Sequence, residues 1–281
     1  MTITDAQVHI WEADRPDRRW PELGHTYKHG PDTLSAEMML AAMDEAGVDR
    51  AVLVPPSFEG DRNDVCLTAA ASYPDRFVVM GRIPLDRRDE AEPMLRAIPD
   101  QSGMLGVRLT FSRGPAEGWL DDGTADWVWP VLEANGIPAM VFPPDKLDRV
   151  ARIAADHPNL KLLIDHLGLR TTLKDAEISP RIDALLDLAV HPNVGVKATC
   201  LASYVSDPYP HSSLHEPIRR VVEAFGPRRV FWGSDTSRLD EPYRKVVTLF
   251  TEELDFLSDE DKEWIMGRAI SEWLGWPESS T

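Results

Sequence analysis

The chain has 281 residues, 43% of them hydrophobic, and its 47 acidic residues outnumber its 30 basic ones. The formal net charge of −17 disfavours nucleic acid and anionic membrane surfaces as partners. Two cysteines suggest no disulfide framework, and no stretch approaches the roughly 18 apolar residues of a membrane span. A strand pattern begins almost at the first residue, so we expect no signal peptide and a cytoplasmic protein.

Eight short apolar segments recur along the chain and are predicted to be β-strands. Most are continuous apolar runs, which is typical of parallel strands buried on both faces. Their ranges are Ile3–His9, Arg50–Pro55, Phe77–Pro84, Gly103–Phe111, Ile137–Phe142, Leu160–His166, Val194–Ala198 and Arg229–Asp235.

Helical patterns alternate with these strands and stop at glycine or proline. We expect helices at Leu34–Ala46, Asp64–Ser72, Glu90–Ile98, Asp126–Ala134, Lys146–Asp156, Ile182–Val190, Leu214–Phe225, Tyr243–Leu254 and Asp259–Leu274. This order predicts an α/β fold in which residues 1–281 form a single (β/α)8 TIM barrel, regular or distorted, with a C-terminal helical extension. A doubly wound open sheet is the alternative, but it would place a glycine-rich phosphate loop after the first strand. That loop reads His9-Ile10-Trp11-Glu12-Ala13-Asp14.

Polar side chains recur where the predicted strands end. Gln7 and His9 close the first strand, and Arg108, His166, Lys197 and Asp235 lie at the ends of the fourth, sixth, seventh and eighth strands. In a TIM barrel these positions surround one mouth, where active sites are built. The pattern therefore predicts an enzyme.

The strand period predicts which of these side chains turn inward. Gln7 and His9 are two residues apart and share one side of their strand. Asp165 and His166 are adjacent, so we expect His166 at the mouth and Asp165 in the layer between strand and helix.

Asp235 ends an apolar strand, where a carboxylate is costly unless it is paired or functional, and it is a candidate general base. Helix capping is the weaker explanation, because Pro242 delays the next helix.

Arg108 and Lys197 are candidates for holding a substrate carboxylate, and the alternative that they extend outward to acidic helices stays open. Arg113, Arg170 and Arg238, just beyond strand ends, add positive charge to the mouth and favour a small anionic substrate. Long loops follow strands one, four and seven, and we expect them to form the lid and the substrate walls. His29 is among their residues, and Trp11 and Tyr204 are candidate walls of the substrate pocket.

Three segments together carry a resemblance to a known family: Asp5-Ala6-Gln7-Val8-His9-Ile10-Trp11, Asp165-His166-Leu167-Gly168 and Gly233-Ser234-Asp235. They resemble the amidohydrolase-related family of the amidohydrolase superfamily. The most similar branch holds 2-pyrone-4,6-dicarboxylate lactonase, sugar-acid lactonases and D-galactarolactone isomerase.

The chain departs from the superfamily pattern at the metal ligands. The superfamily has His-x-His on strand one, where this chain has Gln7 at the first position, and a histidine after strand five, where it reads Val141-Phe142-Pro143. The resemblance to metal-independent branches therefore implies a site without a metal cofactor. The alternative is a single divalent metal, zinc or manganese, held by His9, His166 and Asp235.

The resemblance implies hydrolysis of a lactone, or a related cyclic ester or amide, that carries a carboxylate. Asp235 would activate water, and His9 and His166 would hydrogen-bond the carbonyl oxygen. Arg108 and Lys197 would bind the carboxylate, and Gln7, Trp11 and Tyr204 would complete the substrate site. Alternatives are a metal-dependent hydrolase or decarboxylase, a lactone isomerase, and a binding protein that has lost the chemistry. A homo-oligomer is compatible with the sequence.

Overall fold

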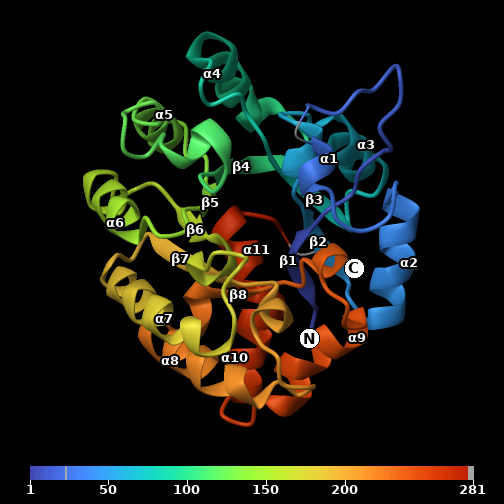
Figure 1. Ribbon diagram of the computed structural model, residues 1–281, viewed down its shortest axis with the longest axis vertical. Helices are drawn as coiled ribbons and strands as arrows, with labels where there is room; N and C mark the ends of the chain where they lie inside the picture. The colour runs from blue at the N-terminus through green and yellow to red at the C-terminus, as the bar shows by residue number, and fades with distance from the viewer. Residues whose placement is uncertain (23, 278–281) are drawn as a thin grey trace.

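Eight parallel strands pair in sequence order around a barrel, and helices surround them (Figure 1). The protein is represented by a computed structural model that describes residues 1–22 and 24–277. The strands are β1 (Thr4–Val8), β2 (Arg50–Leu53), β3 (Phe77–Gly81), β4 (Met104–Thr110), β5 (Ala139–Phe142), β6 (Leu162–Ile164), β7 (Val194–Ala198) and β8 (Val230–Trp232). Each falls within a predicted range, and the predicted (β/α)8 fold is confirmed.

The helices follow the predicted alternation. They are α1 (Gly24–Tyr27), α2 (Ala36–Ala46), α3 (Asp64–Ser72), α4 (Arg88–Ala97), α5 (Val128–Ala134), α6 (Leu147–Asp156), α7 (Ser179–Leu186), α8 (His215–Phe225), α9 (Tyr243–Thr248), α10 (Asp259–Glu263) and α11 (Ala269–Leu274). Helix α2 begins two residues later than predicted, because Leu34 exchanges backbone hydrogen bonds with Trp11 at 2.9 and 3.0 Å. Ser35 then caps the helix by accepting a hydrogen bond from the Met38 amide.

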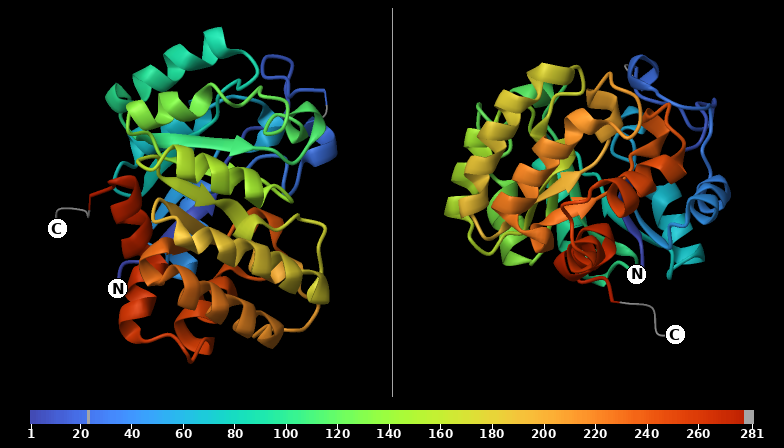
Figure 2. Two further views of the ribbon diagram at one scale, coloured as in Figure 1. Left: turned by 90° about the vertical axis from the view of Figure 1, so that its left-hand side faces the viewer. Right: turned by 90° about the horizontal axis from the view of Figure 1, so that it is seen from below.

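The last predicted helix, Asp259–Leu274, is divided into α10, a π-helical turn at Trp264–Arg268, and α11. The turn packs on the start of the first strand. A Cβ atom on Gly267 would lie 2.5 Å from the backbone oxygen of Thr2, so this contact requires glycine. Together these C-terminal helices cover the end of the barrel at which the strands begin, beside the N-terminus (Figure 2).

The barrel interior is filled by apolar side chains below the mouth. Ala6, Val52, Met80, Met140 and Phe231 are buried there. A second and larger apolar layer lies between the strands and the surrounding helices. The interior is therefore packed as a core, and polar chemistry is confined to its upper end.

Asp5 bridges the first and last strands. Its Oδ1 accepts hydrogen bonds from the amides of Gln7 at 2.8 Å and Ser234 at 2.9 Å, and its Oδ2 accepts one from the Tyr243 hydroxyl at 2.6 Å. A Cβ atom on Gly233 would lie 2.9 Å from Asp5 Oδ1, so glycine permits the close approach. This bridge sets the relative positions of Gln7 and the segment that ends in Asp235.

Among residues 1–22 and 24–277, none of the helices has both the length and the apolar character that a membrane crossing requires. Cys66 and Cys200 are free and buried.

Candidate active site

Five of the residues predicted for the site line one small pocket at the end of the barrel where the strands finish. They are Gln7, His9, Arg108, His166 and Asp235. The enclosed space between them is about 30 Å³, and the whole pocket, including the part open to solvent, is about 380 Å³. Residues from β1, β4, β6 and β8 therefore meet at one point.

His9 and Asp235 face each other across the seam between β1 and β8. His9 Nε2 lies 3.1 Å from Asp235 Oδ1, and His9 Nδ1 lies 2.5 Å from the backbone oxygen of Val54. A carbonyl oxygen only accepts hydrogen bonds, so Nδ1 carries a proton. The other nitrogen faces the carboxylate, so the two side chains form an ion pair whenever that nitrogen also carries a proton.

Asp235 is fully buried and ionised. Burial alone would raise the pKa of this carboxyl group, but the charge at His9, with His166 and Arg238, holds the pKa well below its ordinary value. Neither carboxylate oxygen has a well-aligned hydrogen-bond partner among the residues that the structure describes. The side chain makes no helix-capping hydrogen bond either, so the capping explanation does not apply. What remains is a buried base with unfilled acceptor sites.

Lys197 sets the orientation of the Gln7 amide. The Lys197 ammonium, which has only donors, donates to Gln7 Oε1, so the Gln7 NH2 group must face the imidazoles. Gln7 Nε2 lies 3.4 Å from His166 Nε2 and also 3.4 Å from His9 Nε2. At His9 the carboxylate of Asp235 is closer to Nε2, at 3.1 Å.

His166 is a neutral imidazole with its lone pair on Nε2. Since the Gln7 amide donates toward Nε2, the ring proton sits on Nδ1 and is donated to Thr199 Oγ1 at 2.7 Å. Burial lowers the pKa of His166 to about 4, although Asp235 and Asp165 oppose this. The Lys197–Gln7 pair thus fixes the tautomer of His166.

The prediction that Asp165 turns outward is wrong. Asp165 is fully buried and accepts hydrogen bonds from Arg108 Nε at 2.8 Å and Lys197 Nζ at 2.9 Å. Strand β6 ends at Ile164, and His166 has a left-handed φ of 53°, so the alternation of a strand no longer applies. Both neighbouring side chains therefore turn inward.

This pairing also settles the direction of the two cations. Burial would raise the pKa of Asp165, but Lys197 and Arg108 outweigh it and hold the pKa well below its ordinary value. Both cations point inward rather than to the outer helices. Lys197 is fully buried, bonds Asp165 and Gln7 and does not line the pocket, so it orients other side chains. Its predicted contact with a substrate carboxylate stays a prediction.

Two predicted wall residues are packed away from the pocket. Trp11 is fully buried, donates from Nε1 to the Pro31 oxygen at 3.3 Å, and packs behind the His29 ring. Tyr204 is also fully buried, and its hydroxyl donates to the Leu169 oxygen at 3.1 Å. Neither contacts the pocket, because each is held in the apolar layer beneath its loop.

The pocket also contains His29, from the long loop after strand one, together with Ser57, Thr110, Ser112 and Thr171. Thr110 and Ser112 follow Arg108 at spacings of two, so the strand period could have identified them. His29 lies in a long loop that is expected to wall the substrate site, but no pattern in the sequence distinguishes it from the other residues of that loop. Arg113 and Arg238 also line the pocket, as their positions beyond strand ends suggest.

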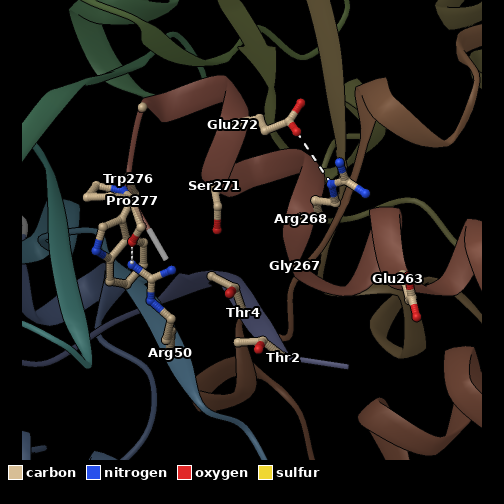
Figure 3. Close-up of a pocket in the computed structure, with 11 residues that line it drawn as sticks. Thr2, Thr4, Arg50, Glu263, Gly267, Arg268, Ser271, Glu272, Trp276 and Pro277 are labelled. Carbon is tan, nitrogen blue, oxygen red and sulfur yellow. Dashed lines mark hydrogen bonds and ion pairs between the residues drawn. The ribbon is translucent and has the colours of Figure 1, made fainter. Parts of the chain in front are cut away.

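A larger hollow of about 700 Å³ lies at the opposite end of the barrel (Figure 3). There the Arg50 guanidinium stacks 3.5 Å from the centre of the Trp276 ring and donates to the Pro277 oxygen at 2.8 Å. Thr4 and Ser271 face the same space (Figure 3). TIM-barrel active sites lie where the strands finish, and the acid–base groups gather there, so the smaller pocket is the candidate site.

Known proteins resemble this chain along almost its whole length. The family model described as amidohydrolase matches residues 4–276. The chain belongs to this amidohydrolase family. It is therefore a hydrolase, and the family resemblance read from the three sequence segments is confirmed.

Two relatives are similar to this chain in sequence, and one solved structure is similar to it in fold. This amidohydrolase is 28% identical over 241 residues to L-fucono-1,5-lactonase of Burkholderia ambifaria, covering 82% of this chain and 79% of the relative. It is 28% identical over 207 residues to 4-sulfomuconolactone hydrolase of Rhizobium radiobacter, covering 73% of this chain and 67% of the relative. Its fold matches a zinc-bound amidohydrolase of Burkholderia multivorans with a TM-score of 0.79 and 20% identity, over 99% of this chain and 100% of the other.

The zinc in that neighbour requires a test of whether this amidohydrolase's own residues fit a metal. The unpartnered oxygens of Asp235 and the His166 lone pair would suit a cation. However, Lys197 holds the Gln7 oxygen, so Gln7 presents NH2 hydrogens rather than a ligand atom, and His9 Nε2 is engaged by Asp235. Within residues 1–22 and 24–277, no three His, Cys, Asp or Glu side chains are arranged to hold a metal ion. Catalytic zinc normally has three protein ligands, which these residues do not supply.

Proposed function

We propose that this amidohydrolase hydrolyses a lactone, or a related cyclic ester or amide, that carries a carboxylate, using water activated by Asp235 and no essential metal. The names of both relatives describe enzymes that act on lactones. The observation that carries the mechanism is the buried, ionised Asp235, with His9 Nε2 at 3.1 Å from one oxygen and His166 Nε2 at 3.8 Å from the other.

The nucleophile is a water molecule between Asp235 Oδ2 and His166 Nε2. Their 3.8 Å separation is too long for a direct hydrogen bond, and a water there can donate one hydrogen to each. Its lone pair then points into the pocket, toward the carbonyl carbon of the ring. As the new C–O bond forms, Asp235 takes the proton.

The acid is His9. The imidazolium donates the proton from Nε2 to the ring oxygen as the C–O bond of the lactone breaks. The proton that Asp235 received then crosses the 3.1 Å contact to His9 and restores the starting state. No net proton is consumed within the enzyme. His166 acts as an acceptor for water in this scheme, and not as a donor to the carbonyl oxygen, because its Nε2 carries a lone pair.

The substrate's charge is met by arginines. Arg108, Arg113 and Arg238 line the pocket, and their positive potential stabilises both the carboxylate and the oxyanion that forms during attack. On a protein with a net charge of −17, this positive patch selects small anions.

The proposal is tested by screening carboxylated γ- and δ-lactones with purified protein, before and after removal of metal with a chelator. We expect acid release, a product heavier than the substrate by one water, and equal turnover in the metal-free protein. Activity that is lost with the metal and restored by zinc or manganese would support the metal-dependent alternative. A product of unchanged mass would support an isomerase.

A further inference from the structure

His29 enters the pocket from the loop between β1 and α2. Its ring lies 5.7 Å from the His9 ring and makes edge contacts with Trp11 at 5.6 Å and Phe58 at 5.5 Å, measured between ring centres. Its Nδ1 lies 3.3 Å from the backbone oxygen of Ser237, in the loop after β8. The imidazole is therefore held on the β1–β8 side of the mouth, and the mechanism above does not use it.

The contact with Ser237 determines what His29 can offer. A carbonyl oxygen only accepts, so the ring proton of His29 is on Nδ1 and Nε2 carries a lone pair. Burial and the neighbouring His9 lower the pKa of His29 to about 4, which keeps the ring neutral. At neutral pH its Nε2 can only accept a hydrogen bond, and a ligand must supply an O–H or N–H group.

Across the barrel, β4 supplies hydroxyl groups to the same pocket. Thr110 Oγ1 and Ser112 Oγ are buried, and neither has a hydrogen-bond partner in the part of the chain that the structure describes. Buried hydroxyls without partners are costly, so these two positions also call for a polar ligand group. Strands β1 and β4 lie on opposite sides of the barrel, so such groups would be needed on both sides of a bound ring.

The remaining lining fits the same interpretation. Of the described residues around the pocket, Pro56 and Phe142 alone are apolar. An unsubstituted ring would leave His29, Thr110 and Ser112 unpaired, whereas hydroxyls on the ring would satisfy them. We propose that His29, with Thr110 and Ser112, recognises hydroxyl groups of the substrate, so that the substrate is a hydroxylated acid lactone. This inference rests on the proposed function, which is lactone hydrolysis, and adds which lactones the site accepts.

Binding of open-chain acids tests the recognition without requiring turnover. Glucarate and adipate are both six-carbon dicarboxylates, and only glucarate carries hydroxyl groups. By titration calorimetry we expect the wild type to bind glucarate more tightly than adipate. His29→Phe, which keeps a packed ring but has no acceptor, should reduce that preference about tenfold, which is the effect of about one hydrogen bond. His29→Gln, which restores an acceptor, should recover part of it.

Two further variants and one control complete the test. Thr110→Val and Ser112→Ala should each lower the preference for glucarate. His25→Phe is a matched control, because His25 is exposed on the same loop and pairs with Asp14 outside the pocket. A preference for glucarate that survives His29→Phe in a folded protein, or a wild type that binds both acids equally, would overturn the inference.

Kinetics separate this inference from the proposed function. The pair of substrates is glucaro-1,4-lactone and 5-oxotetrahydrofuran-2-carboxylate, a γ-lactone that bears a carboxylate and no hydroxyl. We expect the ratio of their kcat/KM values to favour the hydroxylated lactone and to fall about tenfold in His29→Phe. Hydrolysis of the bare lactone alone would overturn the inference and keep the proposed function. If the protein hydrolyses neither lactone but still prefers glucarate in a way that depends on His29, the proposed function is overturned and the inference is kept.

Discussion

Replacing Lys197 with methionine should destabilise the protein and slow catalysis together. Lys197 is fully buried, and its ammonium donates to Asp165 at 2.9 Å and to the Gln7 amide oxygen. Methionine fills similar space but leaves Asp165 with one cation fewer and the Gln7 oxygen without its donor. Removing one partner of a buried ion pair typically costs about 3–5 kcal/mol. Because Arg108 still donates to Asp165 at 2.8 Å, we expect a value near the lower end.

The assay is thermal and urea unfolding of Lys197→Met beside the wild type. At about 2–4 °C per kcal/mol for a domain of this size, a loss of about 3 kcal/mol lowers Tm by roughly 6–12 °C. Freed from Lys197, the Gln7 amide can rotate and no longer fixes the tautomer of His166. We therefore expect kcat to fall about tenfold or more.

Two comparisons make this prediction specific. Lys245→Met removes an exposed lysine that lies 3.5 Å from Glu241, and should change stability by less than about 1 kcal/mol. The double variant Lys197→Met/Asp165→Asn should lose less free energy of unfolding than the two single variants lose together, by at least about 1 kcal/mol. Additive losses of stability in the double variant would refute the coupling of Lys197 to Asp165. A Lys197→Met variant with normal stability and kcat would refute the role of Lys197 in holding Asp165 and Gln7.

Two further predictions concern the seam and the mouth. Burial raises the pKa of Asp5 from 3.8 to about 6, so the folded state favours the protonated carboxyl group. The stability that this group contributes is therefore present below pH 3.8 and is lost as the pH rises through about 6. Asn cannot ionise, so the free energy of unfolding of Asp5→Asn, measured with urea, should rise relative to that of the wild type by up to about 3 kcal/mol between pH 4 and 7. A difference between the two proteins that does not change with pH would contradict this. Arg113→Met should raise KM for carboxylated lactones at least tenfold with a smaller effect on kcat, whereas a loss confined to kcat would argue against a role in binding the carboxylate.

The barrel and its mouth could be predicted from the sequence because both follow from local patterns. The apolar runs and the alternating helices determine the strand order, and the strand order places residues such as His9, His166 and Asp235 at one end. The same reasoning fails where the backbone leaves the strand. Asp165 turns inward because β6 has ended and His166 adopts a left-handed φ of 53°, which no strand period anticipates.

The loop residues were beyond the reach of sequence patterns. Trp11 and Tyr204 are aromatic residues in long loops, and nothing local reveals that both are packed into the layer beneath. His29 reaches the pocket through tertiary contacts with Trp11, Phe58 and Ser237, which lie far apart in the chain. The partnering of Lys197 with Gln7 likewise joins strands β7 and β1, and it could be recognised only from the assembled barrel.

The central claim is that the Asp235 carboxylate activates the attacking water. The most direct measurement is kcat of Asp235→Asn on a carboxylated lactone that the wild type hydrolyses, with Asp240→Asn as a matched control on the exposed part of the same loop. We predict that Asp235→Asn folds normally and loses a factor of about 10²–10⁴ in kcat, while Asp240→Asn keeps wild-type turnover. A folded Asp235→Asn protein that turns over within tenfold of the wild type would contradict the claim.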